Sequence, residues 1–345
     1  ALLFKALCVC HITSDYRTNM RLCFFFFAFV LFRQCRAELC NPDDKQALLQ
    51  IKKDFGNPYL LASWKEETDC CTSWYQVECD STTNRITSLT VFSGTLSGHL
   101  PAAIGDLPYL KTLDFNHLSD VTGPVQPAIA KLTQLRFLRL SKLNLTGAVP
   151  AFLGNLSSLT FLDLSFNMLS GVIPSELAML PNLTALHLDR NRLTGSIPSE
   201  FGNLFGTSSP SIYLSHNRLS GPIPSSFDKL TASIIDLSRN ALSGDPSVLF
   251  GSTKVATSID ISRNNFAFNL SNVILPPGLY YLDMNHNGIF GGLSSQWTQL
   301  DMQFLNVSYN RLCGQIPVGG KLQSFDASAY FHNKCLCGSP LPICH

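Results

Sequence analysis

Two pairs of side chains in this sequence could carry acid–base chemistry: His187 with Asp189, and His216 beside Ser215. An imidazole next to a carboxylate or a hydroxyl can move a proton during a reaction. No nucleophile motif, glycine-rich phosphate loop or metal-spaced cluster of His and Cys accompanies either pair. The segments that carry them resemble strands of an open sheet, which would leave a reacting bond in contact with water. We therefore expect no catalysis, no cofactor and no metal site.

The cysteines offer a second kind of chemistry. Of the twelve, four precede residue 38, and the other eight form two clusters of four. These eight are Cys40, Cys70, Cys71, Cys79, Cys313, Cys335, Cys337 and Cys344. An even number without a C-x-x-C pair, in a secreted chain, favours disulfides over zinc. We expect two bridges at each end, and the cysteine-free middle must be held together in another way.

The start of the sequence has the pattern of a targeting segment. Met20 and Arg21 precede an apolar run of 11 residues from Leu22 to Phe32, followed by "RQCRA" up to Ala37. This pattern is typical of a secretory signal peptide, and the run is far shorter than the roughly 20 residues that a membrane span needs. We predict that residues 1–37 are an upstream extension plus a signal peptide that begins at Met20. The alternative is a buried or anchoring helix.

The rest of the chain is predicted to be folded and slightly acidic. With 45% hydrophobic residues, the sequence can bury a large core. Without residues 1–37, the count of Lys and Arg falls from 25 to 20 and that of Asp and Glu from 24 to 23, a formal charge of −3. This balance argues against nucleic acid as the main partner.

A repeat occupies most of the chain. Ten alternating apolar segments predict strands centred on Leu89–Val91, Leu113–Phe115, Leu138–Leu140, Leu162–Leu164, Leu186–Leu188, Ile212–Leu214, Ile235–Leu237, Ile259–Ile261, Leu282–Met284 and Leu305–Val307. Asparagines at one apparent position follow eight of them: Asn144, Asn167, Asn191, Asn217, Asn240, Asn264, Asn287 and Asn310. L-x-L segments with a following Asn, at a period of about 24 residues, are the signature of leucine-rich repeats.

Each residue type in the repeat has a mechanical role. The Leu and Ile side chains of L-x-L point to one side of the strand, so stacked coils bury them. The eight asparagines are expected to be structural, because a side-chain amide can satisfy backbone groups where the chain leaves the sheet. The following L-[ST]-G-x-[IV]-P segments, such as "LSGVIP", can start a second extended stretch on the outer wall. This form resembles the plant extracellular class of leucine-rich repeats.

These patterns predict an α/β solenoid, a right-handed leucine-rich repeat superhelix of ten repeats with a concave parallel β-sheet and disulfide-capped ends. The parts are an N-terminal cap (38–84), the repeats (85–316) and a C-terminal cap (317–345). A helix opens the first cap, because Asn41 precedes Pro42 at the first helical position and Gly56 provides a stop.

The alternate positions of the strands are left free on the concave face. Ten strands about 4.8 Å apart make a sheet roughly 43 Å across, which can hold another folded protein. Phe161, Phe166 and Tyr213 fall on this face among charges of both signs, as in protein–protein interfaces. A polar, wet sheet would explain the serines, but exposed aromatics cost solubility. We therefore predict that the concave face binds a protein.

Five Asn-x-Ser/Thr sequons could carry glycans in a secreted chain. We assign Asn144 to the asparagine ladder, where a glycan would disrupt the core. The expected acceptors are Asn155, Asn182, Asn269 and Asn306. Asn155 and Asn182 are placed in outer loops. Asn306 is placed on the concave side, where a glycan would limit the binding surface.

Several longer segments carry a family resemblance: "ELCNPDDKQALLQIKKDFGNP", "DCC" at Asp69–Cys71, "PVQPAIAKLTQL", "LSGDPSVLFGS" and "SAYFHNKCLCGSPLPIC". From Glu38 onward, the sequence resembles the plant polygalacturonase-inhibiting proteins. The resemblance implies a location in the plant cell wall or apoplast. It also implies the disulfides Cys40 with Cys70, Cys71 with Cys79, Cys313 with Cys335 and Cys337 with Cys344.

The resemblance further implies a mechanism. Members of this family inhibit endopolygalacturonases secreted by fungi and other plant attackers, docking the concave face at or near the mouth of the pectin-binding cleft. Acidic contact positions match Asp163, Asp189 and Asp236, which would meet basic groups in a cleft built for polyanionic pectin. Positions that vary with target specificity match Lys142, Thr184, His187, Ser211, Tyr213 and Thr257.

The leading hypothesis is a secreted, monomeric plant defence protein that inhibits pathogen endopolygalacturonases. The alternative is a receptor-like or wall-associated recognition module without inhibitor activity, which would need a membrane span, a kinase region or a co-receptor surface; the sequence shows neither of the first two. Contact with pectin itself is a further expectation, against which the slight acidity argues. Ice binding would need a flat, regular array of Thr or Asn, which the mixed strands do not show.

Overall fold

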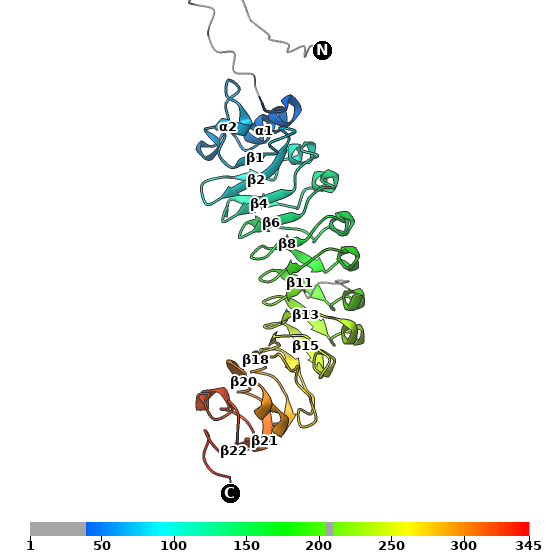
Figure 1. The fold of residues 1–345 in the computed structure, drawn as a ribbon, viewed down its shortest axis with the longest axis vertical. Helices are drawn as coiled ribbons and strands as arrows, with labels where there is room; N and C mark the ends of the chain where they lie inside the picture. The colour runs from blue at the N-terminus through cyan, green and yellow to red at the C-terminus, as the bar shows by residue number, and fades with distance from the viewer. Residues whose placement is uncertain (1–38, 204–209, 345) are drawn as a thin grey trace, which may run out of the picture. The chain divides into compact units, whose positions relative to one another are not determined.

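The structure, a computed structural model, describes residues 39–203 and 210–344. The chain divides into a compact unit from Cys40 to His345 and a preceding segment from Ala1 to Leu39. The predicted leader, residues 1–37, lies outside the described residues. The compact unit is a stack of coils, with one strand of a long sheet in each coil (Figure 1). None of the described helices combines the length and the apolar character needed to cross a membrane.

The long sheet lines the concave side of this unit. Its described strands, in order, are β1 (Val77–Cys79), β2 (Ile86–Phe92), β4 (Thr112–Asn116), β6 (Phe137–Ser141), β8 (Phe161–Asp163), β10 (Ala185–His187), β12 (Ser211–Tyr213), β14 (Ile234–Asp236), β16 (Ser258–Asp260), β18 (Tyr281–Asp283) and β20 (Phe304–Asn306). From β2 onward all pairs are parallel, so the ten predicted strands are confirmed. An additional strand, β1, pairs antiparallel with β2 at the edge; it belongs to the cap and has no L-x-L pattern.

The L-[ST]-G-x-[IV]-P segments form shorter parallel sheets on the next wall, as predicted. One contains β3 (Gly98–His99), β5 (Val121–Gly123) and β7 (Asn144–Leu145); a second contains β9 (Ser170–Val172), β11 (Arg192–Gly195), β13 (Arg218–Gly221), β15 (Ala241–Gly244) and β17 (Asn265–Phe266); a third contains β19 (Phe290–Gly291), β21 (Arg311–Gln315) and β22 (Cys335–Cys337). Gly171 has φ +83°, a conformation that disfavours other residues.

The outer wall consists of short 3₁₀ helices (Figure 1). They are η2 (Ala102–Asp106), η3 (Pro127–Lys131), η4 (Ala151–Asn155), η5 (Ser175–Met179), η6 (Ser199–Asn203), η7 (Ser225–Lys229), η8 (Ser247–Leu249) and η9 (Ser295–Gln299). A coil of about 24 residues leaves room for one tight turn here rather than a longer α-helix. Coils approach closely at this wall: a Cβ on Gly154 would collide with the Glu176 carbonyl of the next coil.

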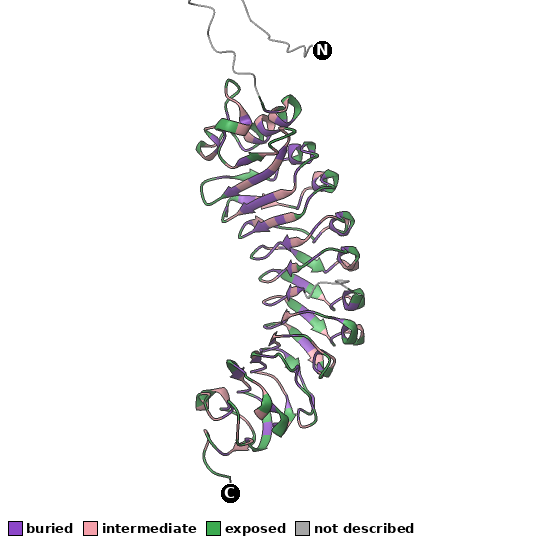
Figure 2. Cartoon of the chain, viewed as in Figure 1, coloured by how far each residue is buried: buried purple, intermediate pink, exposed green. Residues whose placement is uncertain are grey.

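A continuous core runs between these walls. Leu162 and Leu164 are fully buried, and so are the matching residues of the neighbouring coils. In Figure 2, buried segments therefore recur in every coil along the sheet, while the outer helices and loops carry most of the exposed residues. Because the apolar side chains stack from coil to coil, the cysteine-free middle needs no covalent link.

An asparagine ladder satisfies the backbone beside the sheet. The Asn191 amide donates to the carbonyls of Leu164, Leu188 and Asp189 over 2.9–3.3 Å, and its Oδ1 accepts from the backbone N–H of Leu169 at 3.0 Å. The same pattern is made by Asn167, Asn217, Asn240, Asn264, Asn287 and Asn310. Seven of the eight predicted ladder residues are thus confirmed.

The prediction was wrong for Asn144. Leu143 occupies the ladder position of that coil and is buried, whereas Asn144 lies one residue later and donates one hydrogen bond to the Ser119 carbonyl. The ladder instead continues into the C-terminal cap, where Asn333 donates to the carbonyls of Val307 and Tyr330. Consequently, a glycan on Asn144 would not disrupt the ladder, which was our reason for excluding it.

The four sequons that we favoured remain predictions. Asn155 and Asn182 are exposed on the outer wall, and the Asn182 amide donates to the Ser157 carbonyl. Asn269 is exposed as well. Asn306 is half-buried on β20, and its Oδ1 accepts from Ser308, so only part of its side chain faces the solvent.

The N-terminal cap holds α1 (Pro42–Asp54), η1 (Tyr59–Leu61) and α2 (Cys70–Ser73). As predicted, Asn41 caps α1, accepting from the backbone N–H groups of its first turn. Asp44, buried within α1, accepts from both the Arg85 guanidinium and the Ile86 N–H. This buried ion pair links the cap to the first coil. Removing either partner would destabilise the fold, because it would leave an unpaired charge.

Disulfides close both ends with the pairing that the resemblance implies. They join Cys40 to Cys70, Cys71 to Cys79, Cys313 to Cys335 and Cys337 to Cys344. Three sulfurs of the N-terminal cap lie near one another, but all are consumed in disulfides and offer no thiolate to a metal. The C-terminal cap also contains η10 (Ala327–Ala329).

Candidate functional site

Aromatic side chains meet across four neighbouring strands of the concave sheet. The rings of Phe137 and Phe161 stack with centroids 4.5 Å apart, the Phe161 ring lies 5.4 Å from that of His187, and His187 stacks on Tyr213 at 4.3 Å. We call these four residues the aromatic column. All four remain partly exposed. The predicted residues Phe161, His187 and Tyr213 are therefore brought together. Strand alternation also places Phe137 on this face, although it was not among the predicted binding residues.

Arg139 braces one end of this column. Its guanidinium lies over the Phe137 and Phe161 rings, 4.9 and 5.5 Å from their centroids. It also pairs with Asp114 at 3.2 Å and with Asp163 at 3.4 Å. Asp163 is buried, and its other oxygen accepts from the N–H and hydroxyl of Ser165. Both oxygens of this predicted contact residue are thus engaged within the protein.

A second group of carboxylates has fewer partners within the protein than Asp163. Asp236, Asp260 and Asp283 lie side by side in register on β14, β16 and β18, and we call them the acidic row. Each uses Oδ1 to accept from the backbone N–H two residues later. Within residues 39–203 and 210–344, their Oδ2 atoms have no hydrogen-bond partner. A free oxygen on each of three adjacent strands makes this row an acceptor for basic groups.

Thr184 and Thr257 lie where the strands begin, away from the aromatic column. The Thr184 hydroxyl donates to the Thr160 carbonyl at 2.9 Å, and the Thr257 hydroxyl to the Ser233 carbonyl at 3.1 Å. Both hydroxyls thus link successive coils. Ser211 starts β12 and is half-buried beside Tyr213.

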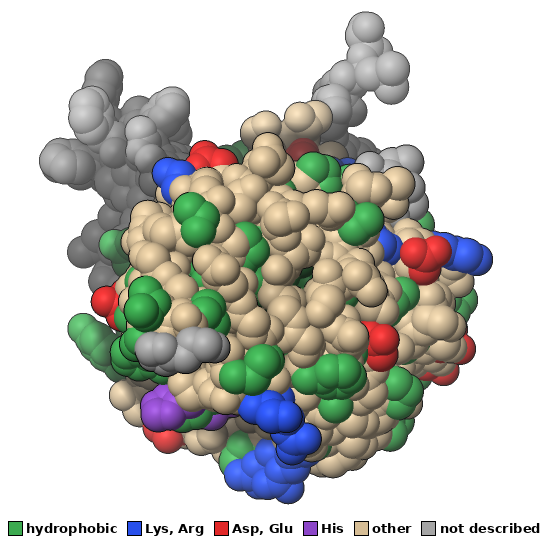
Figure 3. All heavy atoms as spheres, turned by 90° about the horizontal axis from the view of Figure 1, so that it is seen from below, with side chains coloured by type: hydrophobic (Ala, Val, Ile, Leu, Met, Phe, Trp, Pro, Cys, Tyr) green, Lys and Arg blue, Asp and Glu red, His purple; other side chains and the backbone are tan. Residues whose placement is uncertain are grey.

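A third set of side chains follows the end of each strand, and we call it the edge row. Its members share a left-handed backbone with φ between 51° and 57°: Lys142, Phe166, Arg190, His216, Arg239, Arg263, His286, Tyr309 and His332. The Phe166 ring is 40% exposed and is contacted by the cations of Lys142 and Arg190. Seen from the C-terminal end, Lys and Arg side chains gather on one side of the unit, beside histidines (Figure 3). Phe166 and Lys142 thus belong to a basic edge rather than to the floor of the sheet.

The chain is similar to known proteins over most of its length. Residues 41–80 match the family described as leucine rich repeat N-terminal domain, and residues 133–193 and 211–230 match leucine rich repeat families. Polygalacturonase inhibitor 1 of Arabidopsis thaliana is 65% identical over 321 residues, which are 92% of this chain and 97% of that protein. The chain belongs to the polygalacturonase inhibitor family.

Other members and one solved structure agree with this assignment. The polygalacturonase inhibitor of Pyrus communis is 65% identical over 89% of this chain and 93% of its own length. The crystal structure of a plant ice-binding protein has a TM-score of 0.86 and 52% identity, covering 89% of this chain and 98% of that one. The polygalacturonase inhibitor fold therefore also carries another function, and the surface must be read residue by residue.

Neither candidate acid–base pair, His187 with Asp189 or His216 with Ser215, is hydrogen-bonded in the structure. His187 Nδ1 and Asp189 Oδ1 are 3.9 Å apart, beyond hydrogen-bond distance. His216 Nδ1 is buried without a hydrogen-bond partner among the described residues. Burial lowers the pKa of both histidines, so the neutral imidazole is favoured.

Burial also changes the charge state of the concave acids. It raises the pKa of Asp189 to about 7, and the charge of Asp163 adds to the effect. It likewise raises the pKa of Asp260 to about 6. Each group is therefore uncharged more often in the folded chain than in the unfolded chain, where an Asp titrates near pH ~3.9.

We expect the double variant Asp189→Asn/Asp260→Asn to be more stable than the wild type at pH 8. The stability contributed by the protonated carboxyls is fully present below the unfolded pKa and is lost as the pH rises through about 6 and 7. At about 1.4 kcal/mol per pKa unit, the two raised pKa values correspond to an upper limit of roughly 7 kcal/mol at pH 8. We expect about half of this gain, on the order of 2 to 4 kcal/mol, because both carboxyls remain partly solvated, and it vanishes near pH 4. Urea unfolding of both proteins from pH 4 to pH 8 measures the difference; parallel pH profiles would contradict it.

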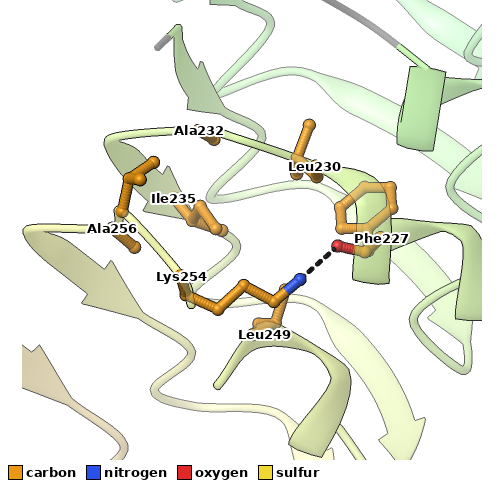
Figure 4. Close-up of a pocket in the computed structure, with 8 residues that line it drawn as sticks. Phe227, Leu230, Ala232, Ile235, Leu249, Lys254 and Ala256 are labelled. Atoms are coloured by element: carbon orange, nitrogen blue, oxygen red, sulfur yellow. Dashed lines mark hydrogen bonds between the residues drawn. The ribbon is translucent and has the colours of Figure 1, made fainter. Parts of the chain in front are cut away.

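A small pocket on the outer wall offers no ligand site. It is lined by core residues including Phe227, Leu230 and Leu249, and the Lys254 ammonium closes it by donating to the Phe227 carbonyl at 3.0 Å (Figure 4). Its space of about 10 Å³ is close to what one water molecule needs. The concave face remains the candidate site.

Proposed function

We propose that this protein binds and inhibits endopolygalacturonases secreted by pathogens and so limits the degradation of cell-wall pectin. The observation that carries the proposal is the concave face of a polygalacturonase inhibitor family member, on which a partly exposed aromatic column adjoins carboxylates with free oxygens. The proposed setting is extracellular, in the plant cell wall, with the protein acting as a monomer.

The chemistry of the target supports this assignment. Polygalacturonate carries a negative charge on each sugar, so an enzyme cleft that binds it must present basic groups. The free oxygens of the acidic row are suited to such groups, and charge complementarity accelerates and orients association. The aromatic column supplies flat apolar area of the kind that carries most binding energy in protein interfaces.

An inhibition assay tests the proposal. The purified protein is incubated with a panel of fungal endopolygalacturonases, and the reducing ends released from polygalacturonate are measured. We expect slower release with at least one enzyme and direct binding to the same enzyme. If no enzyme of a broad panel is bound or inhibited, the proposal is wrong.

A receptor-like binding module is the competing proposal, and it has less support because the relatives reported above are named as inhibitors. It predicts that a pull-down from plant membranes recovers a receptor kinase and no polygalacturonase. That result would favour it over inhibition.

Pectin is a second proposed partner, supported by the edge row. Arg190, Arg239 and Arg263 are exposed at matching corners of their coils, so their cations form a local basic strip even though residues 38–345 are slightly acidic overall. We expect Arg239→Gln/Arg263→Gln to lower retention on immobilised polygalacturonate several-fold in low salt, where charge screening is weak. Lys229→Gln, an exposed cation on η7 of the outer wall, serves as the control, and equal retention of all three proteins would contradict the idea.

A further inference from the structure

A second aromatic pair lies on the concave face, nearer to the C-terminal end. Tyr281 on β18 and Phe304 on β20 stack with centroids 4.4 Å apart and ring planes 9° from parallel. Phe304 is 37% exposed, and Tyr281 is half-buried. Neither residue was in the predicted contact set. An exposed aromatic stack on a rigid sheet costs solubility unless a partner covers it.

The acidic row joins this pair to the aromatic column. Asp260 and Asp283 occupy the strands between Tyr213 and Phe304, on the same concave face, and each retains a free Oδ2 among the described residues. Burial raises the pKa of Tyr281 to about 12, and the neighbouring Asp260 and Asp283 charges add to the shift. The phenol therefore keeps its proton and remains a hydrogen-bond donor beside the acids.

The two aromatic groups are close enough for one partner. Tyr213 on β12 and Tyr281 on β18 are three strand steps apart, roughly 14 Å. A standard interface covers about 800 Å² on each partner, which easily spans this distance. Because β12 to β20 form one sheet in continuous register, a rigid partner seated on the column would also lie over the acidic row.

We propose that Tyr281 and Phe304, with Asp260 and Asp283, are a second anchor for the same endopolygalacturonase molecule that the aromatic column holds. This inference rests on the proposed function. Two features indicate this partner: the sheet continues without a break from the aromatic column, and the charges are complementary. A surface with basic groups and some apolar area suits a row of free carboxylates that ends in a stacked aromatic pair. The second anchor extends the contact toward the C-terminal cap and adds residues that can set target specificity.

Binding kinetics test the second anchor. The double variant Tyr281→Ser/Phe304→Ser is compared with the wild type against an enzyme that the wild type binds. We expect affinity to fall at least tenfold, mainly through faster dissociation, since the loss of packed aromatic area acts on the bound state. Phe290→Ser is the matched control, because Phe290 is a 45% exposed aromatic on β19 of an outer sheet. It should leave affinity unchanged.

A second variant covers the case in which the first misfolds. Asp260→Asn/Asp283→Asn keeps the Oδ1 acceptors that hold each strand end and removes only the charges. At pH 8, where Asp260 is ionised, we expect association to slow several-fold at low salt and to lose part of its salt dependence. Unchanged kinetics in a folded form of either double variant would overturn the inference while the wild type still binds. Failure of the wild type to bind any enzyme would overturn the proposed function instead.

The sequon on the same strand gives an independent check. Asn306 lies two residues after Phe304 on β20 and points to the same face. A glycan there would cover the aromatic pair. The second anchor therefore reverses our sequence-based expectation for Asn306: we now expect mass spectrometry of the protein secreted from plant cells to find Asn306 unmodified, and full occupancy by a glycan would contradict the second anchor.

Discussion

Removing the rings of His187 and Tyr213 should weaken binding of a susceptible endopolygalacturonase at least a hundredfold. These rings stack at 4.3 Å at the β12 end of the aromatic column, and the Phe161 ring contacts His187 from the other side, so both rings enter the complex largely ordered. Pre-ordered aromatic anchors at the centre of an interface typically cost 2 kcal/mol or more each when truncated to alanine. The dissociation constant of His187→Ala/Tyr213→Ala, measured by surface plasmon resonance, tests this expectation.

The control for this experiment lies on the opposite wall. Met179 is a 64% exposed apolar side chain at the end of η5, and Met179→Ala should bind like the wild type. Thermal unfolding must show that both variants retain the fold. Equal losses of affinity in the two variants would exclude the concave face as the binding surface.

Asp163 is a poor choice for the same purpose, although the sequence favoured it. Its carboxylate is buried, accepts a hydrogen bond from Ser165 and forms an ion pair with Arg139. Reversing its charge would place a cation beside Arg139 and break the brace under the column. A loss of binding would then report on folding as much as on contact. Removing the charges of Asp236 and Asp260 avoids this ambiguity, because both side chains are only half-buried and retain a free Oδ2 among the described residues.

Asn191→Ala is expected to lower the free energy of unfolding by roughly 3 kcal/mol or more. The substitution removes four hydrogen bonds and leaves buried backbone groups of two coils unsatisfied. Each such group costs about 1 to 3 kcal/mol. Urea unfolding followed by circular dichroism measures the loss.

Asn144→Ala is the matched control for the ladder. Asn144 makes one side-chain hydrogen bond at a half-buried site, so its removal should cost less than about 1 kcal/mol. If Asn144→Ala destabilises the protein as much as Asn191→Ala, the assignment of Leu143 to the ladder position is wrong. The pair therefore tests the register of the third coil directly.

The periodic part of this protein could be predicted from its sequence. Alternation in L-x-L, a recurring Asn and a Gly–Pro turn each act within one coil, so local pattern suffices to place the strands and the outer wall. The start of α1 was equally local, because Asn41 and Pro42 form a capping signal. The misplacement of Asn144 has the same origin: an Asn one residue out of register satisfies the spacing, and only the burial of Leu143 reveals the error.

Contacts between coils could not be predicted in this way. Arg139 meets both Asp114 and Asp163 because each turn of the solenoid returns the chain to the adjacent strand, some 25 residues later. The same closure stacks His187 on Tyr213 and buries Asp189 enough to raise its pKa. The sequence by itself determined which side chains of the L-x-L strands face the concave side, but not that Lys142 and Phe166 lie at the edge. Only the tertiary structure decided which carboxylates are consumed by internal partners and which stay free, because hydrogen bonding and desolvation depend on the neighbouring coils.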